Sequence, residues 1–177
     1  MLHFDPLAVD PAPDGGPVLF DFTTAGREGS WTPVDDRSVG GESTSALAIE
    51  PRVGSFHGDL APSACGFVSV RATPERPLDL SGAGAIELLA RGDGRTYQLR
   101  LGDGRDGLAW AAAFRPDPGF WRLVQVPLDD LEPMRRGRLA TGEAPLDRRA
   151  VASVALLLAD GEPGSYRLDL RWIRAVR

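Results

Sequence analysis

The chain has 177 residues, of which 42% are hydrophobic and 25% charged, and its formal net charge is −5. This length and composition are typical of one globular domain, and no apolar run approaches the roughly 18 residues of a membrane helix, so we expect no membrane insertion. The acidic balance argues against general nucleic-acid binding, and a single cysteine excludes an internal disulfide framework or a Cys-rich zinc site.

Residues 1–17 are rich in proline and aspartate and are predicted to be a flexible tail, followed by a single β-sandwich domain over residues 18–177. This start lacks the basic and apolar regions of a secretory signal. Together with the lone Cys65, it indicates a reducing, cytoplasmic setting. Lysine and asparagine are absent from the sequence, which indicates a GC-rich, bacterial genome.

Short runs rich in aliphatic and aromatic residues are separated by clusters of Gly, Pro and Asp, a pattern typical of an all-β sandwich or barrel. In chain order, strands are predicted at 18–22, 31–34, 45–50, 55–60, 66–71, 85–91, 96–101, 109–115, 121–126, 153–159 and 165–175. One helical turn is predicted at 147–151, where Asp147 would cap it.

Three of these segments carry further information about their place in a sheet. Polar and apolar residues alternate over 97–101 and 166–172, so each of these strands should have one solvent-exposed face. The segment 153–159 is apolar almost throughout, as expected of a central strand. Asp93-Gly94 is a strong signal for a type I′ turn, so the strands on either side of it are predicted to form an antiparallel hairpin.

The sequence carries no recognisable catalytic or cofactor motif. No Gly-x-Ser-x-Gly occurs, and His57 is more typical of a half-exposed strand residue than of a general base. The Gly-x-Gly pairs at 82–84 and 92–94 each precede a strand, whereas a dinucleotide fingerprint follows one. The segment 103–107 has too few oxygen ligands for an EF-hand. We therefore expect no cofactor, no metal and no catalytic residue.

The remaining features form an ordered series of short blocks. Trp31 is followed by Asp36, by the pair Gly40-Gly41, and by serines; a Gly-Phe-x-Ser-x-Arg block, a Gly-Asp-Gly turn before a tyrosine, a later tryptophan and an Arg-Gly-Arg block come after them. In this order the chain resembles the complex I intermediate-associated protein 30 family. The matching residues are Trp31, Asp36, Gly40, Gly41, Ser43, Ser45, Phe56, Gly58, Gly66, Phe67, Ser69, Arg71, Gly92, Asp93, Gly94, Tyr97, Trp121, Pro127, Gly137 and Arg138.

The resemblance implies a galactose-binding-like jelly-roll β-sandwich of two antiparallel sheets, with at most one or two short helical turns. Eukaryotic members of the family are chaperone-like factors for the assembly of respiratory complex I. The resemblance therefore predicts a non-enzymatic binding or assembly protein whose partner is a respiratory-complex subunit or an assembly intermediate. One departure is Asp35, which stands where the family usually has Asn and follows the general absence of asparagine.

Candidate partner-binding residues come from these blocks. The working surface would include Asp35, Asp36 and Ser43 from the first block, Arg71, and Asp93 with Arg95. A bidentate ion pair between Arg71 and Asp36 is one arrangement of these residues, and it would serve either to bind a ligand or to hold the Gly40-Gly41 turn.

Two alternatives stay open. A carbohydrate-binding module would use Trp110 or Trp121 to stack on a pyranose ring of a saccharide on a concave sheet face, unless both indoles belong to the core. A small bacterial biosynthetic enzyme would need an apolar pocket that holds an Asp or Glu with a raised pKa.

Overall fold

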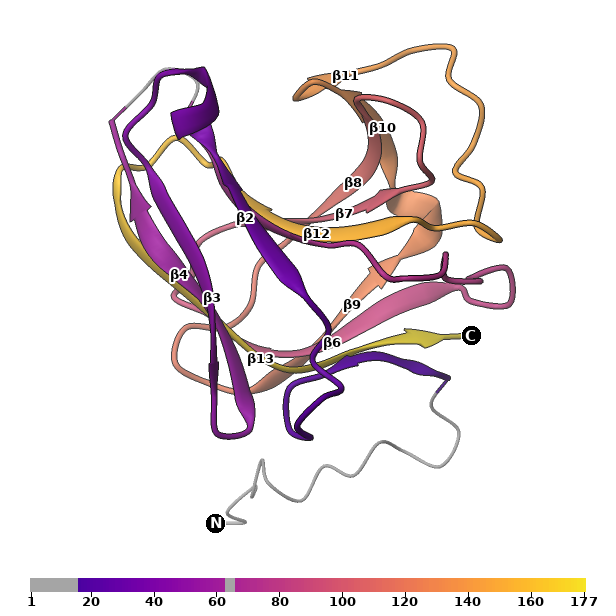
Figure 1. The fold of residues 1–177 in the computed structure, drawn as a ribbon, viewed down its shortest axis with the longest axis horizontal. Coiled ribbons are helices and arrows are strands. Elements are labelled where there is room, and N and C mark those ends of the chain that lie inside the picture. Colours follow the sequence, from indigo (N-terminus) through magenta and orange to yellow (C-terminus); the bar gives the residue numbers. More distant parts are fainter. Residues whose placement is uncertain (1–15, 63–65) are drawn as a thin grey trace.

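The computed structural model describes residues 16–62 and 66–177, which form two antiparallel sheets that pack face to face (Figure 1). The first, called the β13 sheet, has the order β3 (Thr44–Glu50), β4 (Val53–Leu60), β13 (Gly164–Val176), β6 (Ala85–Arg91) and β9 (Arg122–Pro127), and β1 (Val18–Asp21) also pairs with β13. The second, called the β12 sheet, has the order β11 (Arg138–Leu139), β10 (Glu132–Arg135), β8 (Leu108–Phe114), β7 (Tyr97–Gly102), β12 (Ser153–Leu158), β5 (Val68–Ala72) and β2 (Trp31–Asp35).

The all-β prediction is confirmed, and every predicted strand is present with small shifts at its ends. Strands β10 and β11 were not predicted, because Pro133 and the charged residues around it interrupt the apolar pattern on which strand prediction depends. The predicted tail lies almost wholly outside the described residues, and Cys65 lies outside them too. Within the described part of the chain, no helix is long and apolar enough to cross a membrane.

The turn predicted at 147–151 forms with Asp147 as its cap, but it is not helical. Asp147 accepts hydrogen bonds from the backbone nitrogens of Arg149, on its side chain at 3.0 Å, and of Ala150, on its carbonyl at 3.1 Å. This makes an isolated turn, which the chain leaves at once to enter a β-bridge at Val151. The helical turns lie elsewhere, as the 3-10 helices η1 (Asp36–Val39) and η2 (Leu128–Asp130).

The predicted hairpin at Asp93-Gly94 is also wrong, because β6 and β7 belong to different sheets. Gly94 does have the positive φ that a tight turn needs, +88°. The Asp93 carboxylate, however, accepts hydrogen bonds from the Tyr97 hydroxyl (2.9 Å) and the Arg167 backbone nitrogen (2.8 Å). These contacts tie the turn to β13, so the chain crosses from one sheet to the other instead of folding back.

The hydrophobic core lies between the sheets, where β12, β7 and β8 stand above β13, β6 and β9 in Figure 1. β12 is a central strand, as its apolar sequence predicted, and the alternation over 97–101 directs Tyr97, Leu99 and Leu101 inward. The alternation of β13 breaks at a register shift between Leu170 and Trp172, so Ile173 instead of Trp172 joins the core.

Candidate functional site

Asp36, at the start of η1, is almost completely buried and holds the loop that follows it. Its carboxylate accepts hydrogen bonds from the backbone nitrogen of Ser43 (2.9 Å) and from the Ser43 hydroxyl (2.7 Å). The same hydroxyl accepts a hydrogen bond from the backbone nitrogen of Ala61 (3.0 Å). A Cβ at Gly41 would lie 2.2 Å from the Asp36 carboxyl carbon, so only glycine fits there. Asp36, Gly41 and Ser43 therefore form one buried structural unit.

Asp35 caps η1, and its carboxylate, like that of Asp36, is bound by neighbouring residues of the same chain. It accepts hydrogen bonds from Arg37 at Nε (2.9 Å) and Nη2 (2.8 Å), and from the Ser45 hydroxyl (3.2 Å). The Arg37 hydrogen bonds outweigh the effect of burial and hold the pKa of the Asp35 carboxyl below its usual range. The carboxylate that replaces the family's asparagine is thus paired with a neighbouring arginine.

The ion pair considered between Arg71 and Asp36 is not formed. Asp36 bonds to Ser43, whereas Arg71 lies on β5 opposite Thr32 of β2. In the register of the β12 sheet, Arg71 is on the outward-facing side, because its neighbours Val70 and Ala72 are in the core. Arg71 is therefore available to solvent, and Asp36 is not.

Asp93 and Arg95 lie together in the crossover turn, where both are bound by other parts of the chain. Arg95 donates to Asp160 from Nε (2.9 Å) and Nη2 (2.6 Å), and to the backbone carbonyls of Glu162, Gly164 and Ser165. The Asp93 carboxylate is occupied by Tyr97 and Arg167, as described above. These contacts fasten the turn to the start of β13.

The two candidate tryptophans lie apart, and Trp110 is buried at 4% exposure with the guanidinium of Arg105 4.5 Å from its ring centre. Trp121 is half-buried beside the β13 sheet, and the guanidinium groups of Arg91 and Arg171 lie 5.0 Å and 4.8 Å from its ring centre. Trp110 thus offers no platform for a sugar ring, and the Trp121 ring is in contact with two arginines.

The predicted site residues consequently do not form one site. Asp35, Asp36 and Ser43 hold the η1 loop, Asp93 and Arg95 hold the crossover turn, and Arg71 alone faces outward on the β12 sheet. The motif blocks that carry the family resemblance mostly maintain the fold.

The outward face of the β12 sheet carries two open cavities. One, of about 460 Å³, lies over β5, β12 and β7 and extends to the loops before β8 and after β10. We call it the arginine groove, because its lining includes Arg71, Arg100, Arg105 and Arg136. Its floor is made of small residues that include Gly102, Ala109 and Ala155.

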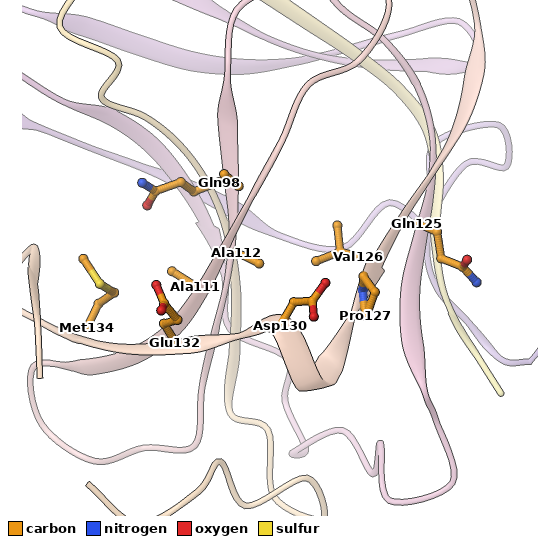
Figure 2. Close-up of a pocket in the computed structure, with 10 residues that line it drawn as sticks. Gln98, Ala111, Ala112, Gln125, Val126, Pro127, Asp130, Glu132 and Met134 are labelled. Carbon is orange, nitrogen blue, oxygen red and sulfur yellow. The ribbon is translucent and has the colours of Figure 1, made fainter. Parts of the chain in front are cut away.

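A second cavity, of about 370 Å³, lies where β8 meets β9, η2 and β10, and Met134 lines both cavities. Figure 2 shows the carboxyl groups of Asp130 and Glu132 on the same side of this cavity, with Gln98 and the alanines of β8 also lining it. Its polar groups are carboxylates and amides, so it can hydrogen-bond to hydroxyl, amide or cationic groups of a ligand.

Sequence reasoning missed Arg100, Arg136, Asp130 and Glu132. A signal existed for Arg100, because the alternation of 97–101 places it on the exposed face of its strand. Arg136 stands at the tip of the β10–β11 hairpin, where it and Gly137 both have positive φ, +50° and +79°. The sequence Arg136-Gly137 thus specifies the type I′ turn that brings this arginine to the groove.

The enzyme alternative requires an Asp or Glu with a raised pKa, whereas the shifts found among the described carboxyl groups run the other way. Each carboxyl group with a displaced pKa has it displaced downward, toward the ionised form: Asp21, Asp35, Asp79, Asp103, Asp160 and Asp169. Across residues 16–62 and 66–177, no three His, Cys, Asp or Glu side chains are grouped so that they could hold a metal ion.

The two antiparallel sheets define a galactose-binding-like jelly-roll domain. Solved structures of other proteins with this fold are similar to this chain. A family 11 carbohydrate-binding module of a cellulosomal cellulase of Clostridium thermocellum matches with a TM-score of 0.66 and 15% identity, over 92% of this chain and 95% of that one. An agarase matches with a TM-score of 0.64 and 16% identity, over 92% of this chain and 25% of the agarase. These likenesses concern the fold.

The family model of Complex I intermediate-associated protein 30 matches residues 20–170. The chain belongs to this family, which confirms the resemblance drawn from the motif blocks.

Proposed function

We propose that this chain is a non-enzymatic, chaperone-like binding domain that engages a protein partner during assembly of a larger complex, by way of the outward face of the β12 sheet. The observation that carries the proposal is the arginine groove, which is open to solvent and floored by small side chains. Membership of the Complex I intermediate-associated protein 30 family supports a respiratory-complex subunit or assembly intermediate as the partner. The sequence supports a bacterial cytoplasmic setting.

Two variants test this proposal by adding the same side chain to opposite faces. Ala111→Tyr places a ring on β8 beside Glu132, on the outward face of the β12 sheet, and Ala46→Tyr places one on β3, on the outward face of the β13 sheet. Partners are crosslinked in cells, quantified, and then measured again with purified components. We expect Ala111→Tyr to lose the partner and Ala46→Tyr to keep it. Equal partner binding by both variants would remove the β12 sheet as the binding surface.

A second candidate function is saccharide binding on the same face. The observation in its favour is the fold match to the family 11 carbohydrate-binding module, which has also been solved in complex with a β-1,3-1,4-mixed-linked tetrasaccharide (TM-score 0.63, 15% identity). The described lining of the two cavities includes no aromatic ring on which a pyranose could stack. Calorimetry with mixed-linked glucan oligosaccharides tests this function, and binding that Ala111→Tyr abolishes would support it over the protein partner.

A further inference from the structure

The two central arginines of the groove are set by strand register. Ala155 of β12 pairs with Arg71 of β5 on one side and with Arg100 of β7 on the other. Residues two strands apart in a sheet are separated by about 10 Å at the backbone. Arg71 and Arg100 therefore lie on either side of the Ala155 methyl group, in one row of side chains on the outward face of the β12 sheet. Their long side chains can both reach a ligand that lies over Ala155.

Some arginines of the described residues form ion pairs and others do not, and of the four in the groove lining Arg105 alone forms one. Ion pairs are formed by Arg37, Arg91, Arg95, Arg105, Arg122, Arg135, Arg148, Arg167 and Arg174. Within residues 16–62 and 66–177, Arg71, Arg100 and Arg136 form no ion pair, and Arg100 donates from Nε (3.0 Å) and Nη2 (2.8 Å) to the neutral amide oxygen of Gln98. The groove thus concentrates unneutralised positive charge.

The positive charge of the arginine groove contrasts with the negative net charge of the whole chain. The chain as a whole has a net charge of −5, and the carboxylate in the groove lining is Asp106, on the loop before β8. Burial, with Arg71 as a second cause, lowers the pKa of the Arg100 guanidinium. An anionic group placed between Arg71 and Arg100 would offset both the burial of Arg100 and the repulsion between the two arginines. It would do so because it gives a half-buried cation a charged hydrogen-bond partner.

We propose that the arginine groove binds a carboxylate-rich, extended segment of a partner protein, with Arg71 and Arg100 each holding a carboxylate and Arg136 contributing at the hairpin tip. This inference rests on the proposed function and specifies its ligand. Guanidinium groups bind carboxylates through paired N–H donors, a geometry that lysine does not offer. In an extended chain, side chains on one face recur every ~7 Å, and arginine side chains are long enough to converge from backbones ~10 Å apart onto two carboxylates at that repeat.

The observations favour an acidic polypeptide over other anionic polymers. A floor of Gly102, Ala109 and Ala155 lets a peptide backbone approach closely, and the described lining lacks the aromatic rings that stack on sugars or nucleobases.

Fluorescence anisotropy with a labelled peptide of alternating Glu and Ser, and with the matched Gln and Ser peptide, tests the ligand. We expect the acidic peptide alone to bind, with an affinity that falls as salt is raised. Arg71→Gln and Arg100→Gln should each weaken binding by about tenfold or more, as the loss of a charge-assisted hydrogen bond does. Arg122→Gln is the control, since Arg122 lies on β9 of the other sheet in an exposed pair with Asp117.

Equal binding of the two peptides, or wild-type affinity in the Arg71→Gln, Arg100→Gln double variant, would overturn the proposal. So would stronger binding of polygalacturonate or inorganic phosphate than of the acidic peptide. If the double variant does not fold, NMR of the wild-type arginine side chains decides the matter, because titration with the acidic peptide must shift the Nε–H signals of Arg71 and Arg100. A cellular partner lost by Ala111→Tyr, together with no peptide binding, would remove the acidic segment as ligand and leave the binding surface in place.

Discussion

The hydroxyl of Ser43 donates to the carboxylate of Asp36 at 2.7 Å while it accepts a hydrogen bond from the backbone of Ala61 at 3.0 Å. Ser43 thereby links the η1 loop to the chain that leaves β4, through a carboxylate that is 1% exposed. A buried charge that loses its hydrogen-bond donor is costly, so this pair makes a larger contribution to stability than a surface contact would.

Ser43→Ala is expected to lower the free energy of unfolding by about 2–3 kcal/mol, because it removes one donor to a buried carboxylate and one acceptor for a partly buried backbone N–H. Urea denaturation measures this loss. The matched control is Ser38→Ala in the same loop, whose exposed hydroxyl donates to the Asp35 carbonyl at 3.0 Å. Its effect should stay within about 0.5 kcal/mol. Similar losses in the two variants would show that the Asp36–Ser43 pair has no special weight.

Gly41→Ala is expected to destabilise the fold by about 2 kcal/mol or more, since the new methyl group would overlap the Asp36 carboxylate, which is buried and bound on both oxygens. Gly82→Ala is the control, because a Cβ at Gly82 meets nothing within 4 Å and its φ is not positive. Thermal denaturation of the two variants compares them directly. A normal melting temperature for Gly41→Ala would mean that the loop can shift to make room.

The sequence specified much of the fold, because strand formation depends on local alternation. It did not specify the groove, since Arg71 and Arg100 become near neighbours only when β12 inserts between β5 and β7. That pairing joins segments far apart in the chain, and no local pattern encodes it. The prediction of a hairpin at Asp93-Gly94 was wrong for the same reason. The turn is locally favourable, but Asp93 is bound to Arg167, which lies on a strand far away in the sequence.

Several of the predicted site residues make their contacts within the chain. Asp36, Ser43 and Arg95 were expected at a binding surface, yet each is bound by buried or backbone groups of the same chain. A recurring polar residue in a loop serves equally well to hold the loop, because buried polar groups need partners. Burial distinguishes the two roles, and the sequence does not report it.

Arg95→Gln is expected to reduce stability without affecting binding of the acidic peptide. The side chain is 11% exposed and pairs with Asp160, which is 13% exposed, so its removal leaves a mostly buried carboxylate without its cation. A loss of about 1–3 kcal/mol is expected by urea denaturation. Arg148→Gln is the control, since its partner Asp129 is 89% exposed. Weaker peptide binding by a folded Arg95→Gln protein would return Arg95 to the binding surface.

Asp169 is expected to make the stability of the protein depend on pH. Burial alone would raise the pKa of its carboxyl, but hydrogen bonds from Arg91, Ser55 and Arg167 outweigh burial and hold the pKa below its usual value. A carboxyl whose pKa is lower in the folded state stabilises the fold above the unfolded pKa, about 3.9, and this contribution disappears as pH falls through the folded pKa.

Asp169→Asn should therefore be less stable than wild type at neutral pH, because Arg91 and Arg167 lose their shared carboxylate, and the difference should shrink as the pH is lowered below about 4. Free energies of unfolding from urea titrations over this range measure the convergence. Asp129→Asn, at an exposed pair, should run parallel to wild type throughout. A constant gap between Asp169→Asn and wild type at all pH values would show that the Asp169 contribution is not linked to its ionisation, and that packing against Ser55 is what the substitution disturbs.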